Sequence, residues 1–121
     1  MQFEDLKAWQ KARQLTNGIY RLCKTIPLKN DFGMRDQLQR AAVSAMTNLA
    51  EGFERVGEGE KLQFWNTARA SAGEVKSLLY VVCDNQLAED GAIQESQALA
   101  IEVSALTQGL INSFSKRRGE R

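Results

Sequence analysis

A helical repeat of apolar residues between Gln37 and Arg55 constrains the fold of this chain more than any other feature. The apolar side chains recur at steps of three and four residues, which places them on one side of an α-helix with 3.6 residues per turn. The spacing therefore predicts a stripe that faces a hydrophobic core. The members of this stripe are Leu38, Ala42, Ala45, Leu49 and Phe53.

A second stripe of small and polar residues runs beside the first on the same predicted helix. Small residues allow two helices to approach closely, but a buried polar side chain needs a partner because leaving it unpaired costs about 1 to 3 kcal/mol. We therefore expect this stripe to bond to a neighbouring helix, and a later small-residue patch at Ala68, Ser71 and Ala72 is its candidate mate. The stripe consists of Gln37, Ala41, Ser44, Asn48, Glu51 and Arg55.

Three further amphipathic segments complete the predicted fold. We expect helices over about residues 5–25, 35–54, 60–86 and 92–115, followed by a basic tail at 116–121. Pro27, the only proline, should end the first helix. No segment shows the alternation of a β-strand, so the pattern predicts a single all-α domain over 1–121, an antiparallel up-down-up-down four-helix bundle. The predicted core face of the last helix is Leu99, Val103, Leu106, Leu110 and Phe114.

The composition excludes several classes of function. The chain has no histidine, which removes the commonest acid-base group and transition-metal ligand. Its two cysteines, Cys23 and Cys83, lack metal-binding spacing and are expected to be reduced thiols in the core. No apolar run spans a bilayer and the N-terminus is unlike a signal peptide, so we expect a cytoplasmic protein that is not an enzyme and has no metal or cofactor.

Glu51 and Glu74 are candidates for a pair of carboxylates inside the bundle, which could bind a metal ion or act in acid-base catalysis. Di-iron bundles add histidine-containing motifs, which this chain lacks. The favoured interpretation is hydrogen bonding between the second and third helices, with Asn48, Arg40 or Ser71 as partners.

The charges are unevenly distributed, although the formal net charge is only +1. Lysine and arginine outnumber the acids nine to six in residues 1–55 and four to one in 116–121, whereas residues 56–115 hold three basic against eight acidic residues. A local basic face can bind nucleic acid even where the total charge is small. The candidate phosphate contacts are Arg40, Arg55, Lys116, Arg117 and Arg118.

Four aromatic residues have two alternative roles. Aromatic side chains stack bases on single-strand-binding surfaces, but in helical proteins they more often belong to the core or to subunit interfaces. We favour the core or interface role. The residues are Trp9, Phe53, Phe64 and Trp65.

The segment from Gln37 to Arg55 also resembles the QLRRAAxSxxxNIAEGxxR signature of a bacterial family of four-helix bundles. This family is encoded in intervening sequences of 23S ribosomal RNA genes and includes the accessory variability proteins of diversity-generating retroelements. The resemblance covers about residues 3–80. Besides Gln37–Ser44, Asn48–Gly52 and Arg55, the matching residues are Phe3, Leu6, Trp9, Gln10, Ala12, Ile26, Pro27, Ala68, Ser71 and Glu74.

The resemblance implies a four-helix bundle that assembles as a homopentamer and, in the retroelement branch, binds nucleic acid and a reverse transcriptase. This chain departs from the family at Ala70, often Gly, and at Arg35, often Thr, and it lacks the strong basic charge of the retroelement proteins. We assign Gln37, Ser44, Asn48, Glu51, Ser71 and Glu74 to architecture. The leading hypothesis is a non-enzymatic homopentamer that presents basic surfaces to structured RNA or DNA. The alternative is a scaffold that binds only protein.

Overall fold

The computed structural model is a bundle of long α-helices, and it describes the backbone of residues 1–119 and the side chains of residues 1–115. Within that range the helices are α1 (Lys7–Leu22), α2 (Phe32–Glu54), α3 (Glu58–Asp84) and α4 (Asp90–Gly119). Two short 3-10 turns, η1 (Phe3–Asp5) and η2 (Leu28–Asn30), precede α1 and α2. No strand occurs among the described residues, so the predicted all-α class is confirmed.

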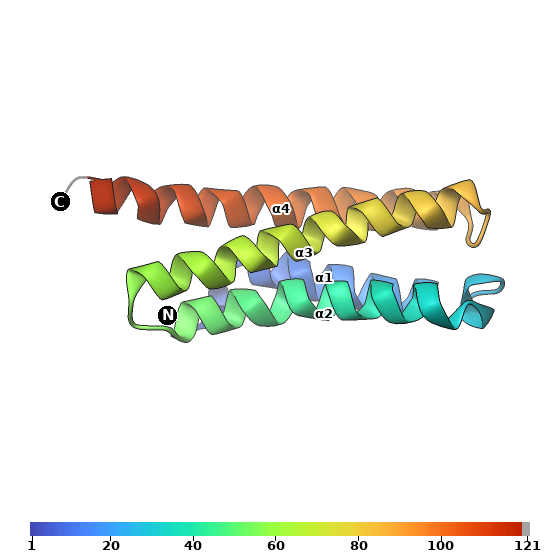
Figure 1. Ribbon diagram of the computed structural model, residues 1–121, viewed down its shortest axis with the longest axis horizontal. Coiled ribbons are helices and arrows are strands. Elements are labelled where there is room, and N and C mark those ends of the chain that lie inside the picture. Colours follow the sequence, from blue (N-terminus) through green and yellow to red (C-terminus); the bar gives the residue numbers. More distant parts are fainter. Residues whose placement is uncertain (120–121) are drawn as a thin grey trace.

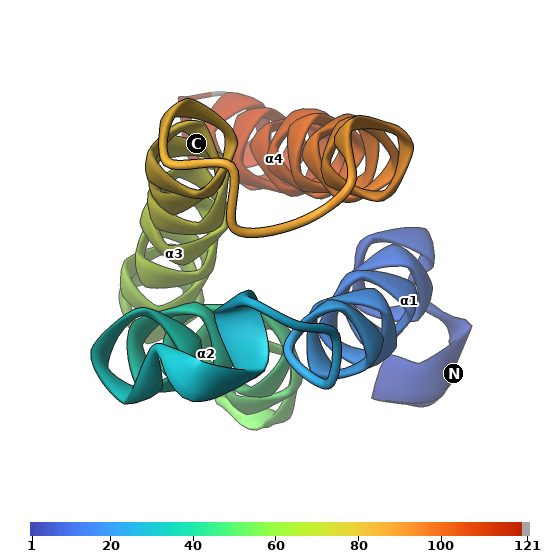
Figure 2. The ribbon, with the colours of Figure 1, turned by 90° about the vertical axis from the view of Figure 1, so that its right-hand side faces the viewer.

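Successive helices run antiparallel along the bundle (Figure 1). The α1–α2 and α3–α4 connections lie at one end, and the α2–α3 connection lies at the other end with both chain termini. Viewed end-on, α3 lies between α2 and α4 on one side, and α1 contacts α2 and α4 on the other (Figure 2). This arrangement is the predicted up-down-up-down bundle.

The core contains most of the residues that the helical period placed there. In α1, the apolar residues that recur at helical steps, Ala8, Ala12, Leu15, Ile19 and Leu22, are all buried, as this spacing predicts. In α2, Leu38, Ala42, Ala45 and Leu49 are fully buried, while Phe53 is half-buried near the helix end. The apolar repeat therefore located the inner faces of these two helices correctly.

The predicted inner face of α4 was wrong in its phase. Of the five residues proposed, only Val103 is buried, and Leu99, Leu106, Leu110 and Phe114 border the core. The buried face of this helix alternates apolar residues with the small or hydroxyl side chains of Ser96, Ala100 and Thr107, so it does not follow the leucine repeat. The buried residues of α4 are Ile93, Ser96, Ala100, Val103, Thr107 and Ile111.

The helix bounds differ from the predicted ones by a few residues, and local capping explains the ends of α2. Asp31 accepts a hydrogen bond from the Met34 amide at 3.1 Å, so α2 begins at Phe32 rather than near residue 35. At the other end, Lys61 Nζ donates to the Phe53 and Gly52 carbonyl oxygens at 2.7 and 3.2 Å. The lysine thereby satisfies carbonyls that have no partner within the helix.

The two cysteines lie in different environments. Cys23 is buried at the end of α1, as predicted, but Cys83 is exposed on α3. The core prediction for Cys83 was wrong because Val82, its neighbour, occupies the inner position and an adjacent residue is rotated by about 100° around the helix. Both thiols are free.

Candidate nucleic-acid interface

The polar stripe of α2 meets α3 through one hydroxyl pair. Ser44 Oγ lies 2.8 Å from Ser71 Oγ, so the structure brings the two predicted small-residue patches together. Asn48 Nδ2 donates to Ser44 Oγ at 3.1 Å and to the Ser44 carbonyl oxygen at 2.8 Å, which orients the serine from within α2. Gln37, at the beginning of the stripe, is exposed. Ser44, Asn48 and Ser71 thus form a structural network rather than an open site.

Glu51 and Glu74 do not come together, and neither crosses the α2–α3 interface as expected. The contact between Ser44 and Ser71 fixes the register of these antiparallel helices. From that contact Glu51 is seven residues further along α2 and Glu74 three residues further along α3, so their positions are about 15 Å apart along the axis at 1.5 Å per residue. Glu51 instead accepts a hydrogen bond from Arg55 at 3.0 Å.

Metal binding finds no support in this arrangement. Within the part of the chain that the structure describes, no cluster of three or more cysteine and acidic residues could hold an ion.

Gly52 has a structural role that the sequence reasoning missed. A β-carbon at this position would lie 2.6 Å from Trp65 Cδ1 and closer still to its Nε1 atom. The indole is fixed in turn, because its Nε1 donates to the Leu49 carbonyl oxygen at 3.2 Å and its ring meets Phe114 edge-on at 5.1 Å between centroids. A glycine inside a helical repeat is the sequence signal that marks such a close approach.

The aromatic residues contribute mainly to packing. Trp9 and Trp65 are buried, which agrees with the core role favoured over base stacking. Phe53 and Phe64 are half-buried, and Lys61 and Arg55 lie over their rings at 5.6 and 4.8 Å.

The predicted phosphate contacts are divided between distant parts of the bundle. Arg40 is highly exposed but forms an ion pair with Asp36 at 3.5 Å, rather than with Glu51 or Glu74. Arg55 is bound by Glu51 at 3.0 Å and lies 4.0 Å from Glu60. The two arginines are fifteen residues apart on α2, or about 22 Å along its axis.

The predicted contacts Lys116, Arg117 and Arg118 have side chains outside the described residues. Their backbone belongs to α4, whose C-terminal end lies at the same end of the bundle as the α2–α3 connection and Arg55 (Figure 1).

The longest run of basic residues without an acid covers α1 and the segment after it, and none of its residues is among the predicted phosphate contacts. Residues 6–30 contain six lysines and arginines and no acidic residue. Of these six, only Lys11 forms an ion pair within the described part of the chain, with Glu102 of α4 at 3.5 Å. Because the inner face of α1 is fully apolar apart from Thr16, the basic side chains collect on its outer face. The exposed residues of this face, here called the α1 basic face, are Lys7, Arg13, Arg21 and Lys24, with Gln10, Gln14 and Asn17 between them.

The neighbouring helix α4 is acidic over most of its length. Residues 92–115 contain no lysine or arginine, and Glu95 and Glu102 are exposed. The basic helix α1 therefore packs beside an acidic stretch of α4, while other basic residues, such as Arg40 of α2 and Arg69 of α3, lie elsewhere on the bundle. Within the described residues, no helix combines the length and the apolar character that crossing a bilayer requires.

Comparison with solved structures supports the fold. A crystal structure from Bacteroides thetaiotaomicron VPI-5482, described as a protein with unknown function from the S23 ribosomal protein family, matches with a TM-score of 0.80. The match covers 86% of this chain and 97% of that chain at 18% sequence identity, so it establishes the shared bundle alone. No curated protein shows significant similarity. The family described as 23S rRNA-intervening sequence protein matches residues 4–109, which is most of the chain, and the protein belongs to this family.

Proposed function

We propose that this protein is a non-enzymatic, homo-oligomeric nucleic-acid-binding protein that holds the phosphates of structured RNA or duplex DNA on the α1 basic face. The observation that carries the proposal is the charge of residues 6–30, where six basic residues occur without a single acid. Lysine and arginine bind phosphates, and amide side chains such as Gln10, Gln14 and Asn17 donate hydrogen bonds to the same backbone.

A homo-oligomer would multiply this surface. Several large apolar or aromatic side chains of α2, α3 and α4 are exposed in the single chain and are available to contact another subunit. They are Val43, Tyr80, Val81 and Ile101. The family resemblance implies five subunits, and each copy would add one α1 basic face to a joint binding surface.

The thiol chemistry is consistent with a role that is not enzymatic. Burial raises the pKa of the Cys23 thiol, and the nearby Arg35 charge and a hydrogen bond with Gln39 only partly oppose that effect. A thiol with a raised pKa has less of the reactive thiolate at neutral pH, so Cys23 is poorly suited to be a nucleophile.

A protein-only scaffold is the second candidate function. It is favoured by the ion pairs that Arg40 forms with Asp36 and Arg55 forms with Glu51, because an arginine that is already paired with a carboxylate binds a phosphate less strongly. The family resemblance makes a reverse transcriptase one candidate partner for such a scaffold.

Charge reversal at two exposed positions distinguishes these functions. Lys24 belongs to the α1 basic face just after the end of α1, Arg69 lies on α3, and Lys24→Glu and Arg69→Glu make the same change in net charge. We expect Lys24→Glu to weaken the binding of a structured RNA, measured by fluorescence anisotropy, severalfold more than Arg69→Glu does. Equal losses of RNA affinity in the two variants would show that binding depends on net charge and not on the α1 basic face. If the unmodified protein does not bind RNA, the protein-only scaffold is favoured.

A further inference from the structure

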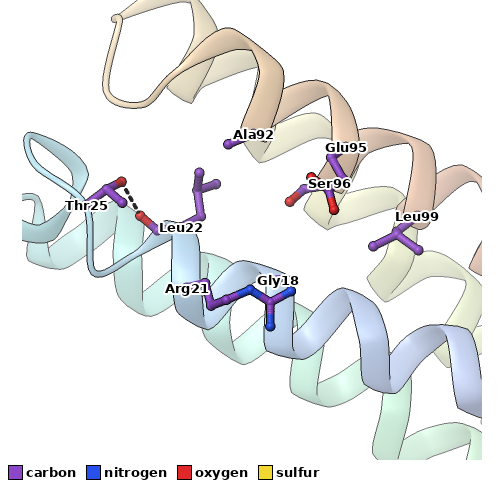
Figure 3. A pocket seen from close by; sticks show the side chains of 8 residues that line it. All are labelled: Gly18, Arg21, Leu22, Thr25, Ala92, Glu95, Ser96 and Leu99. Atoms are coloured by element: carbon purple, nitrogen blue, oxygen red, sulfur yellow. Dashed lines mark hydrogen bonds between the residues drawn. The ribbon is translucent and has the colours of Figure 1, made fainter.

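A small pocket lies between the C-terminal half of α1 and the N-terminal half of α4 (Figure 3). Its volume is about 160 Å³, and it combines an apolar wall with charged groups at its rim. Leu22 of α1 and Ala92 and Leu99 of α4 form the apolar wall. Arg21, Glu95 and Ser96 supply the polar groups.

The hydroxyl of Ser96 is the first sign that the pocket accepts a ligand. Ser96 is only 4% exposed as a residue, and its hydroxyl, which forms no hydrogen bond within the described part of the chain, opens into the pocket. Two other buried hydroxyls are bonded to the preceding helical turn, Thr16 to the Ala12 carbonyl oxygen at 2.8 Å and Thr107 to that of Val103 at 2.7 Å. Among the described residues no fully buried side-chain oxygen or nitrogen lacks a partner, so the Ser96 hydroxyl is available to a molecule in the pocket.

The lining of the pocket leaves the Ser96 hydroxyl accessible. Thr25, at the end of the pocket, is already bonded to the Leu22 carbonyl oxygen at 2.7 Å, as Figure 3 shows. Opposite Ser96 stands Gly18, where a β-carbon would lie 3.8 Å from both Ser96 Oγ and the Arg21 Nη2 atom. Gly18 therefore faces a space that the serine hydroxyl and the arginine guanidinium share.

Two opposite charges flank this space without pairing. Lys11 of α1 and Glu102 of α4 form an ion pair at 3.5 Å, two to three turns away from the pocket along the same helices. Arg21 and Glu95 line the pocket, but neither forms an ion pair within the described part of the chain. The helices thus present a free cation and a free anion on opposite sides of one cavity.

We propose that this pocket binds a small zwitterion, namely a free α-amino acid with a short apolar side chain such as valine. The Arg21 guanidinium would hold the carboxylate of the ligand in a charge-assisted hydrogen bond, and the Ser96 hydroxyl would donate a second bond to it. The Glu95 carboxylate accepts from the ligand ammonium, while the apolar side chain lies against Leu22, Ala92 and Leu99. The site does not rest on the proposed nucleic-acid binding, although Arg21 belongs both to the pocket and to the α1 basic face.

Each group of the pocket selects for one part of such a ligand. A simple carboxylic acid would leave Glu95 without a partner, and a simple amine would leave Arg21 without one. Losing a hydrogen bond to a charged group weakens binding by about tenfold or more. A small ligand in an open pocket binds weakly, so we expect dissociation constants in the millimolar range.

The test is a titration of the full-length protein followed by amide chemical shifts in NMR spectra. Valine should give saturable shifts at the amides of Gly18 and Ser96, whereas isovalerate and isobutylamine, which each lack one charged group of valine, should bind about tenfold more weakly or not at all. Shifts that grow linearly without saturation, or equal affinity for isovalerate, would overturn the proposal.

Three isosteric variants complete the test. Arg21→Gln and Glu95→Gln should each weaken valine binding by about tenfold. Glu102→Gln removes an acidic charge from the same helix but outside the pocket, so it should leave the affinity unchanged. All three side chains are at the surface, and unchanged spectra away from the substitution would show that the fold is kept. Equal affinity in Glu95→Gln and the unmodified protein would rule the site out.

Discussion

At the scale of single residues, the motif from Ser44 to Arg55 acts through packing rather than through chemistry. Ser44 bonds to Ser71, and Gly52 makes room for the Trp65 indole. Part of this was predictable, because the helical spacing of small residues indicated a close contact with another helix. The partner of Gly52 was not predictable, since which side chain fills the space depends on the register between α2 and α3.

Gly52→Ala should destabilise the protein, because the added methyl group would overlap the Trp65 ring. Overpacking of this kind costs about 1 to 3 kcal/mol, which outweighs the higher helix propensity of alanine. Urea unfolding measures the change. The matched control is Gly73→Ala in α3, where the β-carbon meets no atom within 4 Å. That variant should be more stable than the unmodified protein by up to about 1 kcal/mol, and a stable Gly52→Ala protein would contradict the packing role.

The hydroxyl pair of Ser44 and Ser71 should show energetic coupling. Ser71→Ala leaves the Ser44 hydroxyl with only Asn48 as a partner, and we expect a loss of about 1 kcal/mol in the free energy of unfolding. The double variant Ser44→Ala, Ser71→Ala should lose less than the sum of the two single losses. Strict additivity in this double-mutant cycle would mean that the short contact between the hydroxyls contributes nothing.

At the scale of the helices, the sequence predicted α1 and α2 better than α4. The inner faces of α1 and α2 carry leucine, isoleucine and alanine at regular steps, so the repeat located them correctly. In α4 the leucines lie at the flanks, and Ser96, Ala100 and Thr107 occupy the centre. A prediction based on the leucines therefore turns the wrong face of α4 towards the core. The sequence alone does not show that the small residues of this helix are the buried ones.

The start of α2 depends on one capping residue. Asp31→Ala removes the hydrogen bond to the Met34 amide, and we expect a loss of about 1 kcal/mol in the free energy of unfolding. Asp36→Ala is the control, because Asp36 makes only an exposed ion pair with Arg40 within the helix. Its loss should stay below about 0.5 kcal/mol. Similar losses in the two variants would show that charge near the helix start, rather than the cap, matters.

The basic charge of α1 is a property of the whole helix rather than of one residue. Arg40 and Arg55 were predicted from the motif they belong to, but the structure pairs them with Asp36 and Glu51. The α1 basic face could have been found from the sequence, since the absence of acidic residues over 6–30 is visible there. Which of these basic residues stay exposed and unpaired could not be read from the sequence, because that depends on how α1 packs against α2 and α4.

At the scale of the whole molecule, the account requires more than one subunit. The exposed apolar side chains of α2, α3 and α4 should be partly covered in solution, and the family resemblance implies five copies. Sedimentation velocity should give a mass near five times the 13.5 kDa of one chain. Tyr80→Lys, which places a charge on the exposed surface of α3, should shift the distribution towards smaller species. A monomer at all concentrations would refute the assembly.

The most direct test of nucleic-acid binding is the salt dependence of association between the unmodified protein and a structured RNA. If the α1 basic face contacts phosphates, the logarithm of the association constant should fall linearly with the logarithm of salt concentration, with a slope of about −0.7 to −0.9 for each phosphate contacted. We predict a slope that corresponds to several contacts and that becomes shallower by about one contact in Lys24→Glu. Binding that does not change with salt, or no binding at low salt, would contradict the account.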